Sequence, residues 1–110
     1  MKMVVAVIRP EQLPAVKDAL FEADFINLTS SSVMGTAPKT EQQMFRGVRR
    51  EVTLFRRVRV EVAVNDALVE RAIEAITRGA KETGGWGHIF VTEISEVVKI
   101  WTGERGPRAL

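Results

Sequence analysis

The 110-residue sequence contains no cysteine and no tyrosine, and it has a single histidine. Without cysteine, disulfide bonds and thiolate metal sites are excluded, and one histidine argues against a dedicated zinc or copper site. No apolar run approaches the roughly 20 residues of a membrane-spanning helix, and Pro10 interrupts the only early apolar run, so no signal peptide is expected. These absences predict a cytoplasmic protein with no membrane insertion and no metal.

The charges nearly balance, with 16 Lys and Arg against 14 Asp and Glu, but the arginines are unevenly placed. Six of them crowd into one stretch: Arg46, Arg49, Arg50, Arg56, Arg57 and Arg59. Such a run forms either a solvated face or a surface that meets an anion or a partner. With 45% hydrophobic residues, the chain predicts one domain over 1–110 with a real core.

Hydrophobic periodicity predicts the order strand, helix, strand, long loop, strand, helix, strand. We expect strands at 3–8, 28–34, 58–64 and 89–98, a helix from Pro10 to Ala23, and a second helix capped by Asn65 or Asp66 and ended by Gly79. Two such halves predict an α+β, ferredoxin-like fold, with an antiparallel sheet and both helices on one face. The other face is then left uncovered, which favours homo-oligomerisation.

Two loops interrupt this pattern. Residues 36–53 show no periodicity, and a loop of this length in a small domain indicates function or disorder. Residues 81–88 form a glycine loop that includes Gly84-Gly85-Trp86-Gly87-His88. Glycines there are either turn-formers or a phosphate cradle, and no Gly-Lys-Ser/Thr closes the loop, so nucleotide hydrolysis of the P-loop type is not expected.

The segment 98–110 carries the other candidate binding residues. Lys99 alternates with Trp101 in strand spacing just after the last predicted strand, so both should project to one face, where a cation beside an aromatic ring suits an anionic, ring-bearing ligand. The tryptophans could instead lie in the core, but Trp86 sits in a glycine loop, where exposure and stacking are expected. No nucleophile or acid–base set stands out, so the chain is interpreted as a binding protein and not an enzyme.

The chain resembles the PII signal-transduction proteins over nearly its full length, with one small deletion in each of the two loops. The matching segments are residues 1–10 with the helix after them, Phe45-Arg46-Gly47, residues 57–62, residues 85–90, and Thr102-Gly103-Glu104-Arg105-Gly106. The resemblance implies a homotrimer that binds adenine nucleotides (AMP, ADP or ATP) in the clefts between subunits. It implies that residues 36–53 are an effector loop that touches a target protein, such as a transporter or a metabolic enzyme.

The resemblance also implies roles for single residues. Val7, Thr29, Gly35 and Ala63 would lie on the adenine and ribose side. From the neighbouring subunit, the phosphates and ring would be met by Gly85, Gly87, His88, Lys99 and Trp101, with Trp86 in the same loop. Arg57 at the base of the effector loop, with Arg46 in it, would receive an anionic effector.

Departures from the family pattern modify these expectations. Family members commonly have Asp where Trp86 stands, Lys where His88 stands, and Arg where Lys99 and Trp101 stand. Fewer cations should weaken triphosphate binding relative to AMP or ADP. Ala37-Pro38-Lys39 replaces the stretch with a metal-binding glutamine, which argues against 2-oxoglutarate sensing and leaves a small anion such as bicarbonate as the second effector. Arg50 replaces the tyrosine that relatives modify, so uridylylation is excluded.

Two alternatives compete with a divergent PII-like allosteric regulator. A nucleic-acid-binding ferredoxin-like domain would use the arginine cluster, although RNA-binding sheets carry exposed aromatics on central strands where this chain has valine and arginine. A small phosphatase on the same fold would depend on His88. Each has its own assay, namely salt-dependent RNA binding and turnover of a phosphate ester or anhydride.

Overall fold

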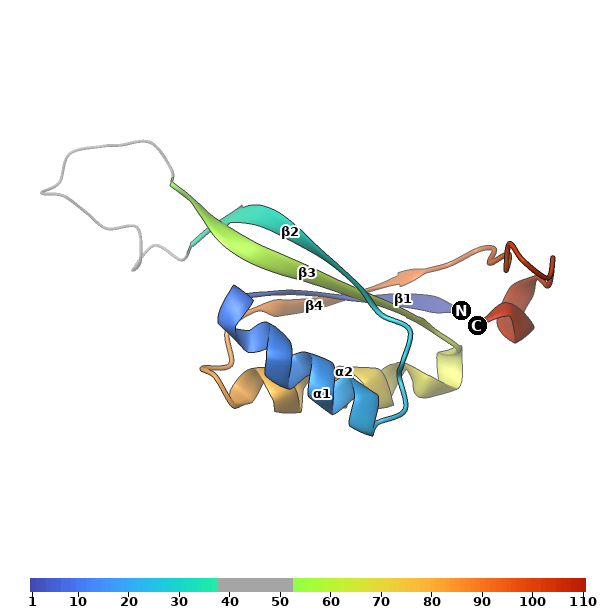
Figure 1. The fold of residues 1–110 in the computed structure, drawn as a ribbon, viewed down its shortest axis with the longest axis horizontal. Coiled ribbons are helices and arrows are strands. Elements are labelled where there is room, and N and C mark those ends of the chain that lie inside the picture. The colour runs from blue at the N-terminus through green and yellow to red at the C-terminus, as the bar shows by residue number, and fades with distance from the viewer. Residues whose placement is uncertain (38–52) are drawn as a thin grey trace, which may run out of the picture.

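The computed structural model describes residues 1–37 and 53–110, which form four strands and two helices (Figure 1). The elements are β1 (Lys2–Ile8), α1 (Leu13–Glu22), β2 (Thr29–Thr36), β3 (Leu54–Val64), α2 (Val69–Lys81) and β4 (His88–Glu93). The predicted effector loop lies almost entirely outside the described residues, and so does Arg46.

The four strands form one sheet in the order β2-β3-β1-β4, and every neighbouring pair is antiparallel. Both helices cover the same face of this sheet (Figure 1). β1 lies at the centre, paired with β3 on one side and β4 on the other. The predicted ferredoxin-like α+β fold is therefore confirmed.

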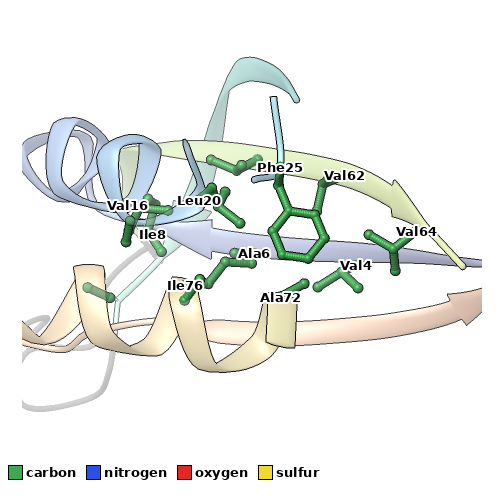
Figure 2. Close-up of a cluster of buried hydrophobic side chains, with 14 of the residues drawn as sticks. Val4, Ala6, Ile8, Val16, Leu20, Phe25, Val62, Val64, Ala72 and Ile76 are labelled. Carbon is green, nitrogen blue, oxygen red and sulfur yellow. The ribbon is translucent and has the colours of Figure 1, made fainter. Parts of the chain in front are cut away.

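The core lies between the sheet and the two helices (Figure 2). Alternation in β3 points Val58, Val60, Val62 and Val64 toward the helices, and all four are buried. The helices contribute small and branched side chains from facing stripes: Val16, Ala19, Leu20, Ala72, Ala75 and Ile76. Burying one large aliphatic side chain of this kind contributes about 1.5–3 kcal/mol, so the stripe that the periodicity identified holds the layers together.

Gly79 does not end α2, contrary to the prediction, since the helix continues to Lys81. A Cβ atom at Gly79 would come within 2.7 Å of the Ala15 carbonyl oxygen and of the Val16 Cα on α1. The glycine is therefore where the two helix backbones approach most closely. The start of α2 also differs, because Asn65 makes no side-chain capping hydrogen bond and a short 3₁₀ turn, Asp66–Leu68, comes first.

The Asp66 carboxylate instead joins the beginning of the chain. It accepts hydrogen bonds from the Met1 amino group at 2.7 Å and from Lys2 Nζ at 3.1 Å. These bonds lower the pKa of Asp66, first through the amino terminus and then through Lys2. The pKa of Lys2 is raised by its bonds to Glu93 and Asp66. The carboxylate thus ties the N-terminal strand to the turn before α2.

The last predicted strand is shorter than expected, because β4 ends at Glu93 and not at Val98. Farther on, Val98 pairs with Arg105 in an isolated bridge. Between them the chain turns back on itself, with the Lys99 N–H donating to Glu104 O at 2.9 Å and the Gly103 N–H donating to Lys99 O at 2.7 Å. We call residues 98–105 the C-terminal turn. None of the helices in residues 1–37 and 53–110 is both long and apolar enough to cross a membrane.

Candidate functional site

The sheet register brings several predicted nucleotide residues to the face that the helices leave open. Val7 on β1 stands opposite Arg59 on β3 and opposite His88 on β4. Residues directly opposite one another in antiparallel strands share a face, and Arg59 is exposed while its even-numbered neighbours on β3 are in the core. Val7 and His88 therefore lie together on the open face, at the end of the sheet nearest the glycine loop.

The remaining predicted adenine and ribose residues are spread along the same face. Thr29 stands opposite Glu61, Ala63 opposite Met3, and Gly35 opposite Phe55. From the level of Phe55 to that of Ala63 the strand rises about 27 Å. One small ligand cannot reach this whole set within a single chain, so the set divides between two ends of the sheet.

The glycine loop leaves α2 and returns to the sheet beside β1. The Gly85 N–H donates to the Ala80 carbonyl oxygen at 2.9 Å. Gly87 has φ +131°, and a Cβ atom there would overlap the Val7 carbonyl oxygen and approach Ile8 Cγ2 at 3.2 Å. Gly87 is thus required by the close approach of two backbones, a structural role besides the predicted ligand role.

Gln12 supports the glycine loop from inside the core, a role that the sequence did not predict. The side chain is fully buried, its Nε2 donates to Ala80 O at 3.2 Å, and its Oε1 accepts from the Arg9 N–H at 2.7 Å. Ala80 O is the same oxygen that receives the Gly85 N–H. A lone polar residue at the start of a predicted helix gives no sequence signal for this role, because Gln12 and Ala80 meet only through the packing of α1 on α2.

Trp86 lies beside two arginines and is half-buried, so the prediction that its side chain would be exposed is wrong. The Arg57 guanidinium carbon lies 4.3 Å from the indole centroid, and that of Arg9 lies 5.3 Å away. Both distances are within the range of cation–π contact. The indole therefore stacks on this chain's own arginines.

Arg57 is only 5% exposed. Its Nη1 donates to Arg56 O at 2.9 Å, and the Phe55 ring centroid lies 5.4 Å from its guanidinium carbon. The Nε and Nη2 atoms are buried and find no hydrogen-bond partner among the residues that the structure describes. Gly35 adjoins this side chain, since a Cβ atom there would lie 3.4 Å from Arg57 Cγ.

The C-terminal turn places a cation beside an aromatic ring, as expected, but for a different reason. Lys99 Nζ lies 5.7 Å from the Trp101 ring centroid and 3.4 Å from a Glu104 carboxylate oxygen. Strand alternation predicted this pairing, whereas the turn between Val98 and Arg105 produces it. Trp101 is 80% exposed and its neighbour Ile100 is 92% exposed, so the turn presents an uncovered apolar surface next to a cation.

The glycine loop and the C-terminal turn lie at opposite ends of the sheet (Figure 1). β4 begins at His88 beside Val7 and ends at Glu93 beside Lys2, a rise of roughly 17 Å, and the turn follows beyond that end. The structure therefore does not bring the two groups together within one subunit. The strand that joins them in sequence is what separates them in space.

A hollow of about 110 Å³ lies against the glycine loop, lined by Ile8, Ile76, Trp86 and His88 among others. Ligand pockets of drug-sized molecules enclose about 300–1,000 Å³, so this hollow by itself is too small for a ligand of that size. Within residues 1–37 and 53–110, no group of three or more His, Cys, Asp or Glu side chains could hold a metal ion.

The chain is similar to known proteins over its whole length. The family model described as Nitrogen regulatory protein P-II matches residues 1–104. Nitrogen regulatory protein GlnK1 of Methanosarcina mazei is 42% identical over 114 residues, covering 100% of this chain and 97% of that protein. The proteins called Nitrogen regulatory protein P-II in Azospirillum brasilense and Rhodospirillum rubrum are each 42% identical over 113 residues, with both chains fully covered.

Proposed function

Because this chain belongs to the P-II family of nitrogen regulatory proteins, we propose that it is a cytoplasmic, homotrimeric regulator that senses adenine nucleotides. The nucleotide binds in the clefts between subunits, and the segment between β2 and β3 carries the signal to a target protein, a transporter or a metabolic enzyme. The protein acts by binding and switching a partner and not by catalysis.

The observation that carries the proposal is the placement of two half-sites at opposite ends of one sheet. The glycine loop adjoins His88 and Val7 at one end, and the C-terminal turn holds Lys99 and Trp101 at the other. Contacts that join unlike ends of identical subunits form a ring when the rotation from one subunit to the next closes, as it does for the threefold rotation of the proposed trimer. In such a ring the glycine loop of one subunit meets the C-terminal turn of the next, and each cleft receives the parts that a single chain keeps apart.

The open sheet face supports the same assembly. A hollow of about 680 Å³ on this face is lined by Val5, Val7, Arg59, Glu61 and Phe90 among others. Arg59 and Glu61 form an ion pair of 3.3 Å there, and Phe90 is 52% exposed. An apolar surface of this kind, set with a paired charge, suits burial against copies of the same chain.

The cations of the two half-sites favour short phosphate chains. His88 is exposed at the start of β4, and Lys99 is already paired with Glu104 at 3.4 Å. Trp101 offers an aromatic face in place of a further cation. Because a triphosphate gains more than a monophosphate from each charge-assisted donor, we expect AMP and ADP to bind at least as well as ATP.

Arg57 is the candidate receptor for a second, small anion such as bicarbonate. Its Nε and Nη2 form the side of the guanidinium that binds the two oxygens of a planar O–C–O group. These two atoms are buried without a partner among the described residues, and buried donors of this kind call for an acceptor. Arg46, predicted to assist, lies outside the described part of the chain.

Isothermal titration calorimetry with AMP, ADP and ATP tests the proposal on the wild-type protein, with His88→Ala and Lys99→Ala as variants. Each variant should weaken ADP binding by about 10- to 150-fold, because one charge-assisted hydrogen bond contributes roughly 1.5–3 kcal/mol. Light scattering should give the mass of three subunits. The proposal is refuted if none of the three nucleotides binds to protein that is folded and trimeric.

A further inference from the structure

We infer that Trp86 is a positioning residue that couples the glycine loop to Arg57, so that a ligand at either place changes the affinity of the other. The inference rests on the proposed function in that nucleotide occupies the glycine loop. It goes beyond that function by assigning the communication between the two places to one aromatic contact.

The contact joins two elements that the chain order keeps apart. Trp86 belongs to the glycine loop, and Arg57 belongs to β3 near the point where the segment after β2 re-enters the sheet. The Arg57 guanidinium carbon lies over the Trp86 ring, 4.3 Å from its centroid. Arg9, at the end of β1, also lies 5.3 Å from the indole centroid. The indole therefore connects the loop with two strands of the sheet.

The burial of Arg57 leaves two of its nitrogen atoms, Nε and Nη2, to be satisfied by a bound anion. An aromatic ring stacked on a guanidinium leaves the in-plane N–H groups available, and here Nε and Nη2 have no partner in residues 1–37 and 53–110. The same two atoms are closed off from solvent. An anion reaches them only when the side chains packed around Arg57 rearrange, and the position of the guanidinium is set in part by the indole 4.3 Å away.

Two separate hollows flank the stacked pair. Trp86 lines the hollow of about 110 Å³ against the glycine loop, whereas Arg57 lines a groove of about 390 Å³ with Met34, Arg56 and Pro10. A ligand that fills one hollow presses on one member of the pair, and the stacked partner faces the other hollow. By linkage, each ligand must then alter the affinity of the other by the same factor.

The test measures this factor. The dissociation constant of ADP is determined by calorimetry without and with a saturating planar oxyanion, using bicarbonate and 2-oxoglutarate as separate probes at matched ionic strength. In the wild type, at least one anion should change the ADP constant by about fivefold or more. Trp86→Leu should bring the ratio to about one while ADP still binds, and Trp86→Phe should restore part of it.

A matched control and a second route keep the test decisive. Phe21→Leu removes another aromatic ring, 47% exposed on α1, and should keep the wild-type ratio. If Trp86→Leu does not fold, Trp86→Met replaces it, because methionine also lacks an aromatic face for the guanidinium; it too should bring the ratio to about one.

Two results overturn the inference while ADP sensing stands. One is a wild-type ratio within twofold of one for both anions. The other is a ratio unchanged from the wild type in Trp86→Leu or, where that variant does not fold, in Trp86→Met. A folded trimer that binds no nucleotide refutes the proposed function, and the coupling with it.

Discussion

Gly87→Ala tests whether the glycine loop is shaped by backbone packing before any ligand binds. Gly87 has φ +131°, and an added Cβ would overlap the Val7 carbonyl oxygen while lying 3.2 Å from Ile8 Cγ2. A residue forced into such a region costs about 1–3 kcal/mol. Overpacking against the β1 backbone costs about another 1–3 kcal/mol, so the free energy of unfolding should fall by about 2–6 kcal/mol.

Gly84→Ala is the matched control. Gly84 also has a positive φ, +98°, but an added Cβ would have nothing within 4 Å. This variant should lose only the conformational part, about 1–3 kcal/mol. Urea denaturation of both variants, at the same subunit concentration, gives the difference from their midpoints. If the two variants lose the same free energy to within about 0.5 kcal/mol, the packing argument for Gly87 is wrong.

Three further substitutions test the supports of the site and the fold. Gly79→Ala gains about 1 kcal/mol of helix propensity but forces a Cβ to 2.7 Å from the Ala15 carbonyl oxygen; a thermal midpoint at or above that of the wild type would contradict the close helix approach. Gln12→Leu leaves the Arg9 N–H without its 2.7 Å acceptor and removes one donor from the Ala80 carbonyl, so urea unfolding should show a loss of about 1–3 kcal/mol. Asp66→Asn should lower the melting temperature at pH 7. Because the pKa of Asp66 is lowered below its ordinary 3.8, the carboxylate stabilises the fold above that pH, and the gap between variant and wild type should close as the pH falls through and below it; a gap that is constant from pH 7 to pH 2 would exclude this role.

The part of the sequence that predicts the fold most clearly is strand β3. Strict alternation of valine from Val58 to Val64 assigns its two faces, and every valine is buried where the alternation predicts. Once this strand pairs with β1, the antiparallel order follows from the two helices and their short connections. Residue type and spacing contain this information because burial on one face of a sheet has a period of two.

Gly79 shows why local patterns fail at element ends. A glycine after the last residue of an apolar stripe is typical of a helix end, but here the missing side chain allows the contact with Ala15 and Val16 across the helix interface. The same holds for Lys99 and Trp101, whose spacing fits both a strand and a turn. Only the Val98–Arg105 bridge decides between them.

The site depends on contacts that no spacing could give. Trp86 and Arg57 stand out as single residues, one as an unusual loop residue and the other as part of an arginine run. Their stacking requires the glycine loop to fold back over the start of β3, which depends on tertiary packing. The sequence therefore identified the participants but assigned Trp86 to exposed stacking and missed its partner.

In the ring proposed above, the glycine loop and the C-terminal turn of one subunit belong to two different clefts, so a substitution in the loop leaves the cleft that contains the turn unaffected. A trimer mixed from His88→Ala and Lys99→Ala chains would therefore rebuild intact clefts wherever the sound loop of one chain meets the sound turn of its neighbour. Random mixing in equal amounts would restore about a quarter of the clefts. Two inactive variants of this protein would thus complement each other when they are expressed together. This follows from β4, whose six residues keep the glycine loop and the C-terminal turn of one subunit apart.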